Sequence, residues 1–165
     1  MIAVSNTTPL RYLIAIEQEN LLGQLFEAVF VPPAVHAELT DARTPEKVRQ
    51  RVLSLPKWFE VRTLQLTSPA PDLIGLHRGE REAILLAESL SADVLLMDEQ
   101  TGRAIAVGRK LPLSGTLGVL ERADATALLN DFPLVLKQLK ASGFFIAESL
   151  ERKLLQRHRA RRGTK

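Results

Sequence analysis

Short apolar runs alternate along the chain with longer segments in which apolar residues return every three or four positions. The short runs, which predict strands, lie at residues 2–5, 29–31, 58–61, 94–97 and 111–115. The segments with helical spacing lie at residues 10–16, 21–28, 34–39, 44–55, 79–90, 101–108, 116–125, 130–141 and 148–159. Short strands that alternate with helices predict a three-layer α/β/α sandwich with a mainly parallel central sheet.

Local signals support several of these boundaries. Pro33 can open a helix, Thr44 is a candidate N-cap, and Gly143 is a candidate C-terminal stop. Residues 67–72 combine Pro, Ser and Thr and read as a loop.

The stretch at residues 92–103 organises the expected sheet. Residues 94–97 are apolar without alternation, which is typical of a strand covered on both faces. Asp98 follows directly. Ligands of open α/β sheets bind beyond the carboxyl ends of the strands, so Asp98 is a candidate site residue. The alternative is that Asp98 caps the next helix, because Asp is a preferred N-cap.

Composition narrows the class of protein. The 165 residues fit one domain, and a hydrophobic content of 45% argues against disorder. The absence of Cys excludes disulfides, a thiolate nucleophile and Cys-ligated zinc. The first residues lack the pattern of a signal peptide, and no apolar run reaches the length of a membrane span. We therefore expect a cytoplasmic protein without a membrane segment.

The positive charge is concentrated at the C-terminus. Residues 149–165 carry seven Lys or Arg and one acid, which leaves 15 basic and 18 acidic residues elsewhere. We expect a body at residues 1–145 and a C-terminal amphipathic helix with a basic tail at residues 146–165. The tail can hold phosphates by sequence-independent attraction, or it can be a solubilising, frayed end.

Four oxygen-bearing side chains stand out: Asn6 and Asp98 follow expected strands, Glu38 lies late in the helix after the second strand, and Glu82 lies in the first turns of the helix before the central strand. Carboxylates that converge above one sheet edge repel one another unless a cation neutralises them. Hard oxygen ligands favour Mg²⁺ or Mn²⁺ over zinc. Taken singly, Glu38 also fits a solvated helix charge, and Glu82 fits a favourable contact with a helix N-terminus. Glu80 and Glu82 are two apart on a helix, so they cannot face the same point.

Other site chemistries have weaker support. There is no Gly-rich dinucleotide loop after the first strand and no phosphate-binding Lys loop. The three His (His36, His77 and His158) show no metal-binding spacing, and Ser114 lacks the flanking Gly residues of a nucleophile elbow.

An ordered set of motifs resembles the PIN-domain ribonucleases, and within them the small PIN-like proteins of the DUF3368 family. The motifs are VSNTTPL at 4–10, VPPAVHAEL at 31–39, GEREAI at 79–84, LLMDEQTGR at 95–103, GTLGVL at 115–120 and LKASGF at 139–144. Each motif is weak alone, but the ordered set is specific and extends to about residue 157.

The resemblance implies an α/β/α sandwich with an acidic pocket for Mg²⁺ or Mn²⁺ and metal-dependent cleavage of RNA. It implies Glu38, Glu82 and Asp98 as acidic metal ligands, with Thr116 as a polar residue near the last strand. Arg103 is a candidate for binding RNA phosphates. Many small members resemble toxins of type II toxin–antitoxin pairs, which implies an antitoxin protein as partner and a homodimer.

One position departs from the family pattern, because Asn6 stands where the family has its first aspartate. An amide is a poorer ligand for a hard dication than a carboxylate, so metal affinity and rate should fall. Two hypotheses follow: a weakened but working endoribonuclease in which Asn6 assists the metal, or a catalytically inactive module that binds RNA or protein. A phosphoryl-transfer signalling domain is a third, weaker hypothesis, because it needs paired acids after the first strand and Asn6 with Thr7 does not supply them.

Overall fold

In the computed structural model, which describes residues 1–54, 56–65 and 70–163, five strands form one parallel sheet in the order β3-β2-β1-β4-β5. The strands are β1 (Ile2–Ser5), β2 (Ala28–Val31), β3 (Phe59–Val61), β4 (Val94–Leu96) and β5 (Leu113–Ser114). The helices are α1 (Thr7–Ala15), α2 (Asn20–Leu25), α3 (Pro33–Thr40), α4 (Glu46–Leu53), α5 (Arg78–Ser89), α6 (Gln100–Gly108), α7 (Thr116–Ala125), α8 (Phe132–Ala141) and α9 (Glu148–Gly163), with a 3₁₀ turn at Pro71–Leu73.

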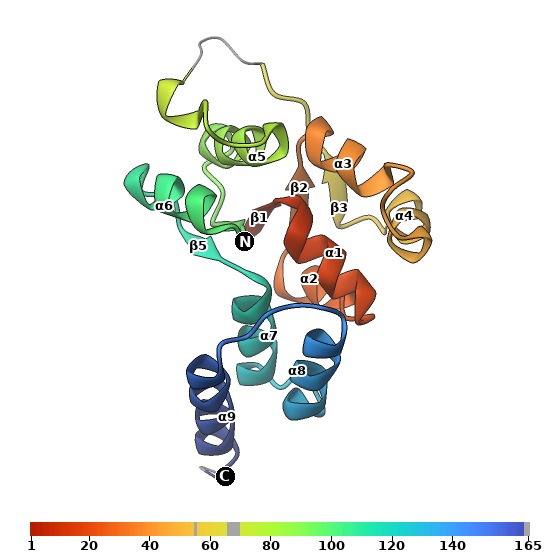
Figure 1. Ribbon diagram of the computed structural model, residues 1–165, viewed down its shortest axis with the longest axis vertical. Helices are drawn as coiled ribbons and strands as arrows, with labels where there is room; N and C mark the ends of the chain where they lie inside the picture. The colour runs from red at the N-terminus through yellow and green to blue at the C-terminus, as the bar shows by residue number, and fades with distance from the viewer. Residues whose placement is uncertain (55, 66–69, 164–165) are drawn as a thin grey trace.

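Helices cover both faces of this sheet (Figure 1). Alternate strand residues point to opposite sides, so Ala3 belongs to the core cluster that includes residues of α1, α2, α4 and α7, whereas Val4 belongs to the one that includes residues of α5 and α6. Residues 94–97 are buried throughout, as expected for a strand covered on both faces. The prediction of a parallel α/β/α sandwich is confirmed.

Two local predictions differ from the structure, and a third falls partly outside the described residues. Ala28 belongs to β2 rather than to the preceding helix, because α2 ends at Leu25 and Ala28 pairs with Ile2 of β1. Thr44 does not cap α4; Pro45 occupies the N-cap position, and the Thr44 hydroxyl donates instead to the Glu38 carbonyl at 2.7 Å. Part of the expected loop at residues 67–72 lies outside the described residues, as does Leu55, and Pro71 opens the 3₁₀ turn.

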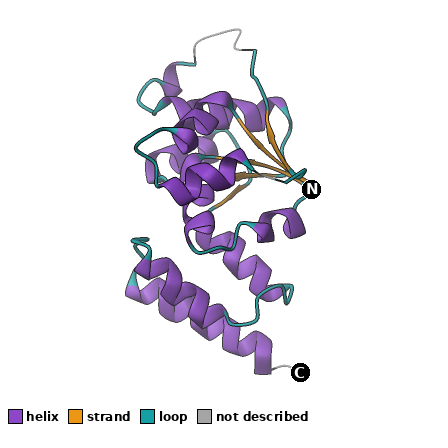
Figure 2. Cartoon of the chain, turned by 90° about the vertical axis from the view of Figure 1, so that its right-hand side faces the viewer, coloured by secondary structure: helices purple, strands orange, loops and turns teal. Residues whose placement is uncertain are grey.

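The C-terminal segment forms α9, which ends near the C-terminus away from the sheet (Figure 2) and packs against α7. Its contact centres on Asp124, whose side chain is fully buried and accepts hydrogen bonds from Arg161 at 2.5 Å and His158 at 2.9 Å. Burial raises the pKa of the Asp124 carboxyl, but Arg161 and His158 outweigh burial and leave that pKa below its ordinary value. Leu154 adds an apolar anchor in the main core.

No helix in the described part of the chain is long and apolar enough to cross a membrane.

Candidate functional site

The sheet reverses its winding direction between β1 and β4, which lie side by side at its centre. From β1 the chain proceeds to β2 on one side, whereas β4 and β5 build the other side. The carboxyl ends of these strands meet at one rim, because Ser5 pairs with Leu96 and the backbone N–H of Asn6 donates to the Leu96 carbonyl at 2.9 Å. Asn6 and Asp98 therefore follow the two strands that flank the switch point, where ligands of open α/β sheets bind.

A polar cavity of about 520 Å³ opens at this rim. It is lined by Asn6, Thr7, Thr8, Arg11, Glu38, His77, Arg78, Glu80 and Glu99. Two of the predicted site residues share this cavity: Asn6, which follows β1, and Glu38, which lies on α3. Its lining carries three carboxylates and two guanidinium groups, so it offers oxygen donors for a cation beside cations for an anion.

Asn6 carries an unsatisfied acceptor. The residue is 3% exposed, and its buried Oδ1 has no hydrogen-bond partner among the residues described. A buried carbonyl oxygen left without a partner costs about 1–3 kcal/mol, so such an atom calls for an explanation. A cation or a donor in the adjoining cavity would satisfy it.

Glu38 is held at the cavity wall by two neighbours. The Thr7 hydroxyl, at the start of α1, donates to Glu38 Oε2. On the other side Gly79 leaves room for the carboxylate, because a Cβ atom at that position would lie 2.5 Å from Glu38 Oε1. The start of α5 therefore packs against Glu38 only because residue 79 lacks a side chain.

Glu82 lies one turn after Gly79 on α5, and its negative charge is already paired with an arginine. Arg78 Nε donates to Glu82 Oε1 at 2.8 Å, and the Ala34 amide at the start of α3 donates to Oε2 at 3.1 Å. Glu80 points elsewhere, because its carboxylate reaches back to the His77 amide at 3.2 Å. That contact caps α5, so it agrees with the expectation that Glu80 and Glu82 do not face one point.

Asp98 is paired with Thr116, which begins α7 after β5. The Thr116 amide donates to Asp98 Oδ1 at 2.9 Å, and its hydroxyl donates to Oδ2 at 2.6 Å. Gly115 permits this approach, because a Cβ atom there would lie 2.5 Å from Asp98 Oδ1. Burial raises the pKa of the Asp98 carboxyl, and the hydrogen bonds from Thr116 only partly oppose the rise.

Arg103, expected to grip RNA phosphates, is half-buried beneath this rim. Its Nη1 donates to the Met97 carbonyl at 2.7 Å and its charge lies near Asp98. In this arrangement Arg103 supports the end of β4.

The structure does not bring Glu38, Glu82 and Asp98 together in the way the sequence led us to expect. Across residues 1–54, 56–65 and 70–163, no three Asp, Glu or His side chains are grouped so that they could hold one metal ion. The reason is local, because each of the three carboxylates is bound by its own neighbours: Thr7, Arg78 with Ala34, and Thr116.

Sequence reasoning also missed Arg11, Arg78 and Glu99 on the cavity wall. Glu99 could have been found, because it follows Asp98 directly. The two Arg residues gave no signal, because single charges on helices are usually solvated.

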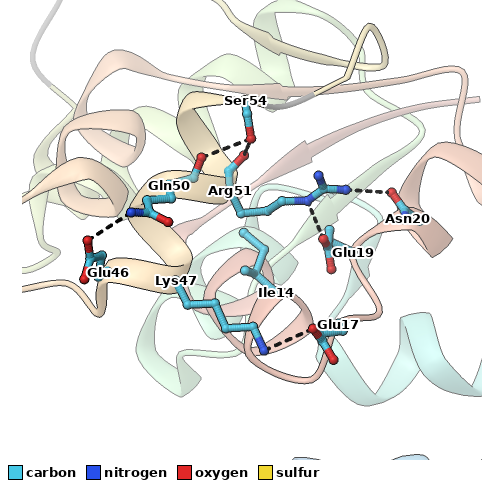
Figure 3. Close-up of a pocket in the computed structure, with 9 residues that line it drawn as sticks. All are labelled: Ile14, Glu17, Glu19, Asn20, Glu46, Lys47, Gln50, Arg51 and Ser54. Carbon is cyan, nitrogen blue, oxygen red and sulfur yellow. Dashed lines mark hydrogen bonds and ion pairs between the residues drawn. The ribbon is translucent and has the colours of Figure 1, made fainter.

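A second cavity, of about 750 Å³, lies between α4 and the segment that joins α1 to α2 (Figure 3). Its charged side chains largely pair with one another, as Arg51 does with Glu19 at 2.5 Å and Lys47 with Glu17 at 3.5 Å. It adjoins the far end of α1, about 13 Å along that helix from Asn6. It is therefore separate from the rim at the strand ends.

Comparison with protein-family models gives one match that spans nearly the whole chain: the DUF3368 family, described as a PIN domain, matches residues 2–160. The chain belongs to the DUF3368 family of PIN domains. The suspected family is thus confirmed. PIN domains are generally nucleases that use divalent metals, so the fold is of nuclease type. A search of curated proteins gives no match to this chain.

Proposed function

We propose that this PIN domain is a metal-dependent endoribonuclease whose active site is the rim at the carboxyl ends of β1 and β4. The observation that carries the proposal is the orphaned Asn6 Oδ1, which is buried at the switch point beside a cavity that also holds Glu38. Membership of the PIN family adds support for nuclease chemistry.

The oxygen donors fit Mg²⁺ or Mn²⁺ in kind. Mg²⁺ commonly keeps several waters and uses only one or two carboxylates, so a cage of three acids is not required. Asn6 and Glu38, which line the same cavity, would hold the ion. Glu82 and Asp98 lie outside that lining and are not grouped with Glu38, so they would become ligands only by moving toward the ion as it binds. Hydrogen bonds from Thr116 and Ala34 do not preclude this, because a carboxylate accepts about four and ligating carboxylates are themselves usually hydrogen-bonded.

The chemistry that a bound divalent cation supplies at such a site is neutralisation of phosphate charge and activation of water. The protein's own residues do the positioning. Arg11 and Arg78 line the same cavity and offer guanidinium groups to RNA phosphates, a geometry that suits two hydrogen bonds to one phosphate. Thr7 and Thr116 keep Glu38 and Asp98 in fixed orientations, so that the negative charge stays at the rim.

The test is cleavage of single-stranded RNA by the purified protein with Mn²⁺, with and without a chelator. We expect cleavage that the chelator abolishes and that falls by at least about a hundredfold in Glu38→Gln and Asp98→Asn, the scale expected when a charged transition-state contact is lost. Cleavage that persists unchanged in both variants would mean a different site or a contaminating nuclease.

A catalytically inactive module that binds RNA or a protein is the second candidate function. Asn6, a neutral residue where the family has an acid, favours it, as do the partners already bound to each of the three acids. In that case the protein binds RNA with the same affinity in Mn²⁺ and in chelator, and it cuts in neither.

The resemblance to small PIN proteins of type II toxin–antitoxin pairs leads us to include a cytoplasmic toxin role, an antitoxin protein as partner and a homodimer in this proposal. Expression of the chain alone should then arrest growth, and co-expression with the product of a small adjacent gene should relieve the arrest. Normal growth on expression of active enzyme would refute the toxin role while leaving the nuclease intact.

A further inference from the structure

Arg78 forms an ion pair with Glu82 within the same helix. It is the first residue of α5, and its Nε donates to Glu82 Oε1 at 2.8 Å. The Glu82 side chain is 10% exposed, so its charge needs a nearby partner. The same Arg78 lines the cavity that holds Asn6 and Glu38. A side-chain cation thus occupies a position next to the proposed metal ligands.

This ion pair is weak on physical grounds. The Arg78 side chain is 75% exposed, so solvent around its guanidinium group screens the attraction to the buried Glu82 carboxylate. The order is also the less favourable one, with the cation near the positive end of the helix dipole and the acid behind it. The two terminal nitrogens of Arg78 make no hydrogen bond to the described part of the chain, so they are available to an anion.

We propose that Arg78 exchanges partners during substrate binding. Without a divalent cation, Arg78 neutralises Glu82. When a cation takes over that role, the guanidinium group turns to a phosphate of the RNA. This inference rests on the proposed function, because it assumes a divalent cation beside Glu82. It assigns Arg78 a positioning role that couples metal binding to RNA binding.

The first consequence concerns metal affinity without RNA. Because Arg78 is largely exposed, we expect the paired state to be favoured only about two- to threefold over the open state, so Arg78→Gln should tighten Mn²⁺ binding about threefold. Arg11→Gln is the matched control, since Arg11 lines the same cavity and has the same charge but forms neither a hydrogen bond nor an ion pair with Glu82, whose charged partner is Arg78. We expect a smaller change in the control.

The second consequence concerns RNA. With Mn²⁺ present, Arg78→Gln should weaken binding of a fluorescent single-stranded 2′-O-methyl RNA about tenfold, as expected for a lost charged hydrogen bond. It should also lower the slope of log affinity against log salt by about 0.7, the value for one phosphate contact on a single strand. In chelator, where Arg78 stays on Glu82, the same substitution should change RNA affinity by less than about twofold.

Isothermal titration with Mn²⁺ and fluorescence anisotropy with this RNA measure both effects on the full chain, after thermal melts show that each variant folds. Arg78→Lys keeps the charge but not the two-pronged geometry, so it should retain wild-type Mn²⁺ affinity and lose RNA affinity. Equal Mn²⁺ affinity in wild type and Arg78→Gln, or an equal RNA defect with and without Mn²⁺, overturns the exchange alone. Failure of every variant, wild type included, to bind Mn²⁺ overturns the proposed metal site and the exchange with it.

Discussion

Restoring the missing acid, in Asn6→Asp, should make the metal-free protein less stable and its response to metal larger. Asn6 is 3% exposed and its side-chain oxygen has no partner in the described residues, so an ionised carboxylate there would be buried without compensation. The effective penalty for one buried ion is several kcal/mol, and we expect a loss of about 2–4 kcal/mol at pH 8. For a chain of this size that loss lowers the melting temperature by about 4–16 °C.

Mn²⁺ should reverse this loss. A ligand at a hundred times its dissociation constant stabilises the folded state by about 2.7 kcal/mol, and the added charge should strengthen binding beyond that of Asn6. The assay is thermal unfolding followed by circular dichroism at pH 8 and pH 5.5, with Mn²⁺ or chelator. Burial raises the pKa of the introduced carboxyl, so the penalty should shrink as the pH falls and the group takes up a proton.

Asn6→Ala is the control, because it removes the orphaned oxygen without adding charge. It should unfold at or above the wild-type temperature and lose most of the Mn²⁺ response. If Asn6→Asp without metal is as stable as wild type, and Mn²⁺ shifts both proteins equally, then Asn6 does not face a cation site and the reasoning fails.

Further substitutions test the surroundings of the site. Gly79→Ala should keep or slightly raise stability, because Ala favours a helix. It should nevertheless lower RNA cleavage at least tenfold, because the added Cβ displaces Glu38. Gly108→Ala is the control, because no atom lies within 4 Å of a Cβ added there. Asp98→Asn should be more stable than wild type at pH 7 in urea melts, because burial raises the pKa of Asp98; this advantage should vanish as the pH falls through that raised pKa and the wild-type carboxyl becomes neutral. Asp124→Asn should cost about 2 kcal/mol at pH 7, because the hydrogen bonds from Arg161 and His158 would then go to an uncharged side chain. Because the pKa of Asp124 is lowered in the fold, its stabilisation is present above the ordinary value of 3.8 and is lost as the pH falls through the lowered pKa, so wild type and variant should converge in acid.

The sequence predicted the layers of the fold well because the strong signals were local. The uninterrupted apolar run at residues 94–97 marked a strand buried on both faces, and helical spacing over residues 79–90 marked α5 to within a residue. Element boundaries that depend on pairing between distant residues were harder to predict from the sequence. Ala28 fits a helix by composition, and only its pairing with Ile2 places it in β2.

In the candidate site, too, the backbone positions could be predicted from the sequence and the side-chain contacts could not. The placement of Asn6 and Asp98 at neighbouring strand ends follows from sheet topology, which the alternation of elements had already indicated. Side-chain contacts did not follow, because the hydrogen bonds of Thr116 to Asp98 and of Arg78 to Glu82 depend on how separate helices begin. Gly79 and Gly115 matter for the absence of a side chain, and a single sequence does not signal such a requirement.

The central claim, that the rim at β1 and β4 binds a divalent cation through Asn6 and Glu38, is tested most directly by Mn²⁺ titration of the metal-free protein, with free ion followed by electron paramagnetic resonance. We predict one bound ion per chain in wild type, lost in Glu38→Gln and retained in Glu148→Gln, which removes an exposed acid on α9. Absence of bound Mn²⁺ in wild type, or equal binding in wild type and Glu38→Gln, would contradict the claim.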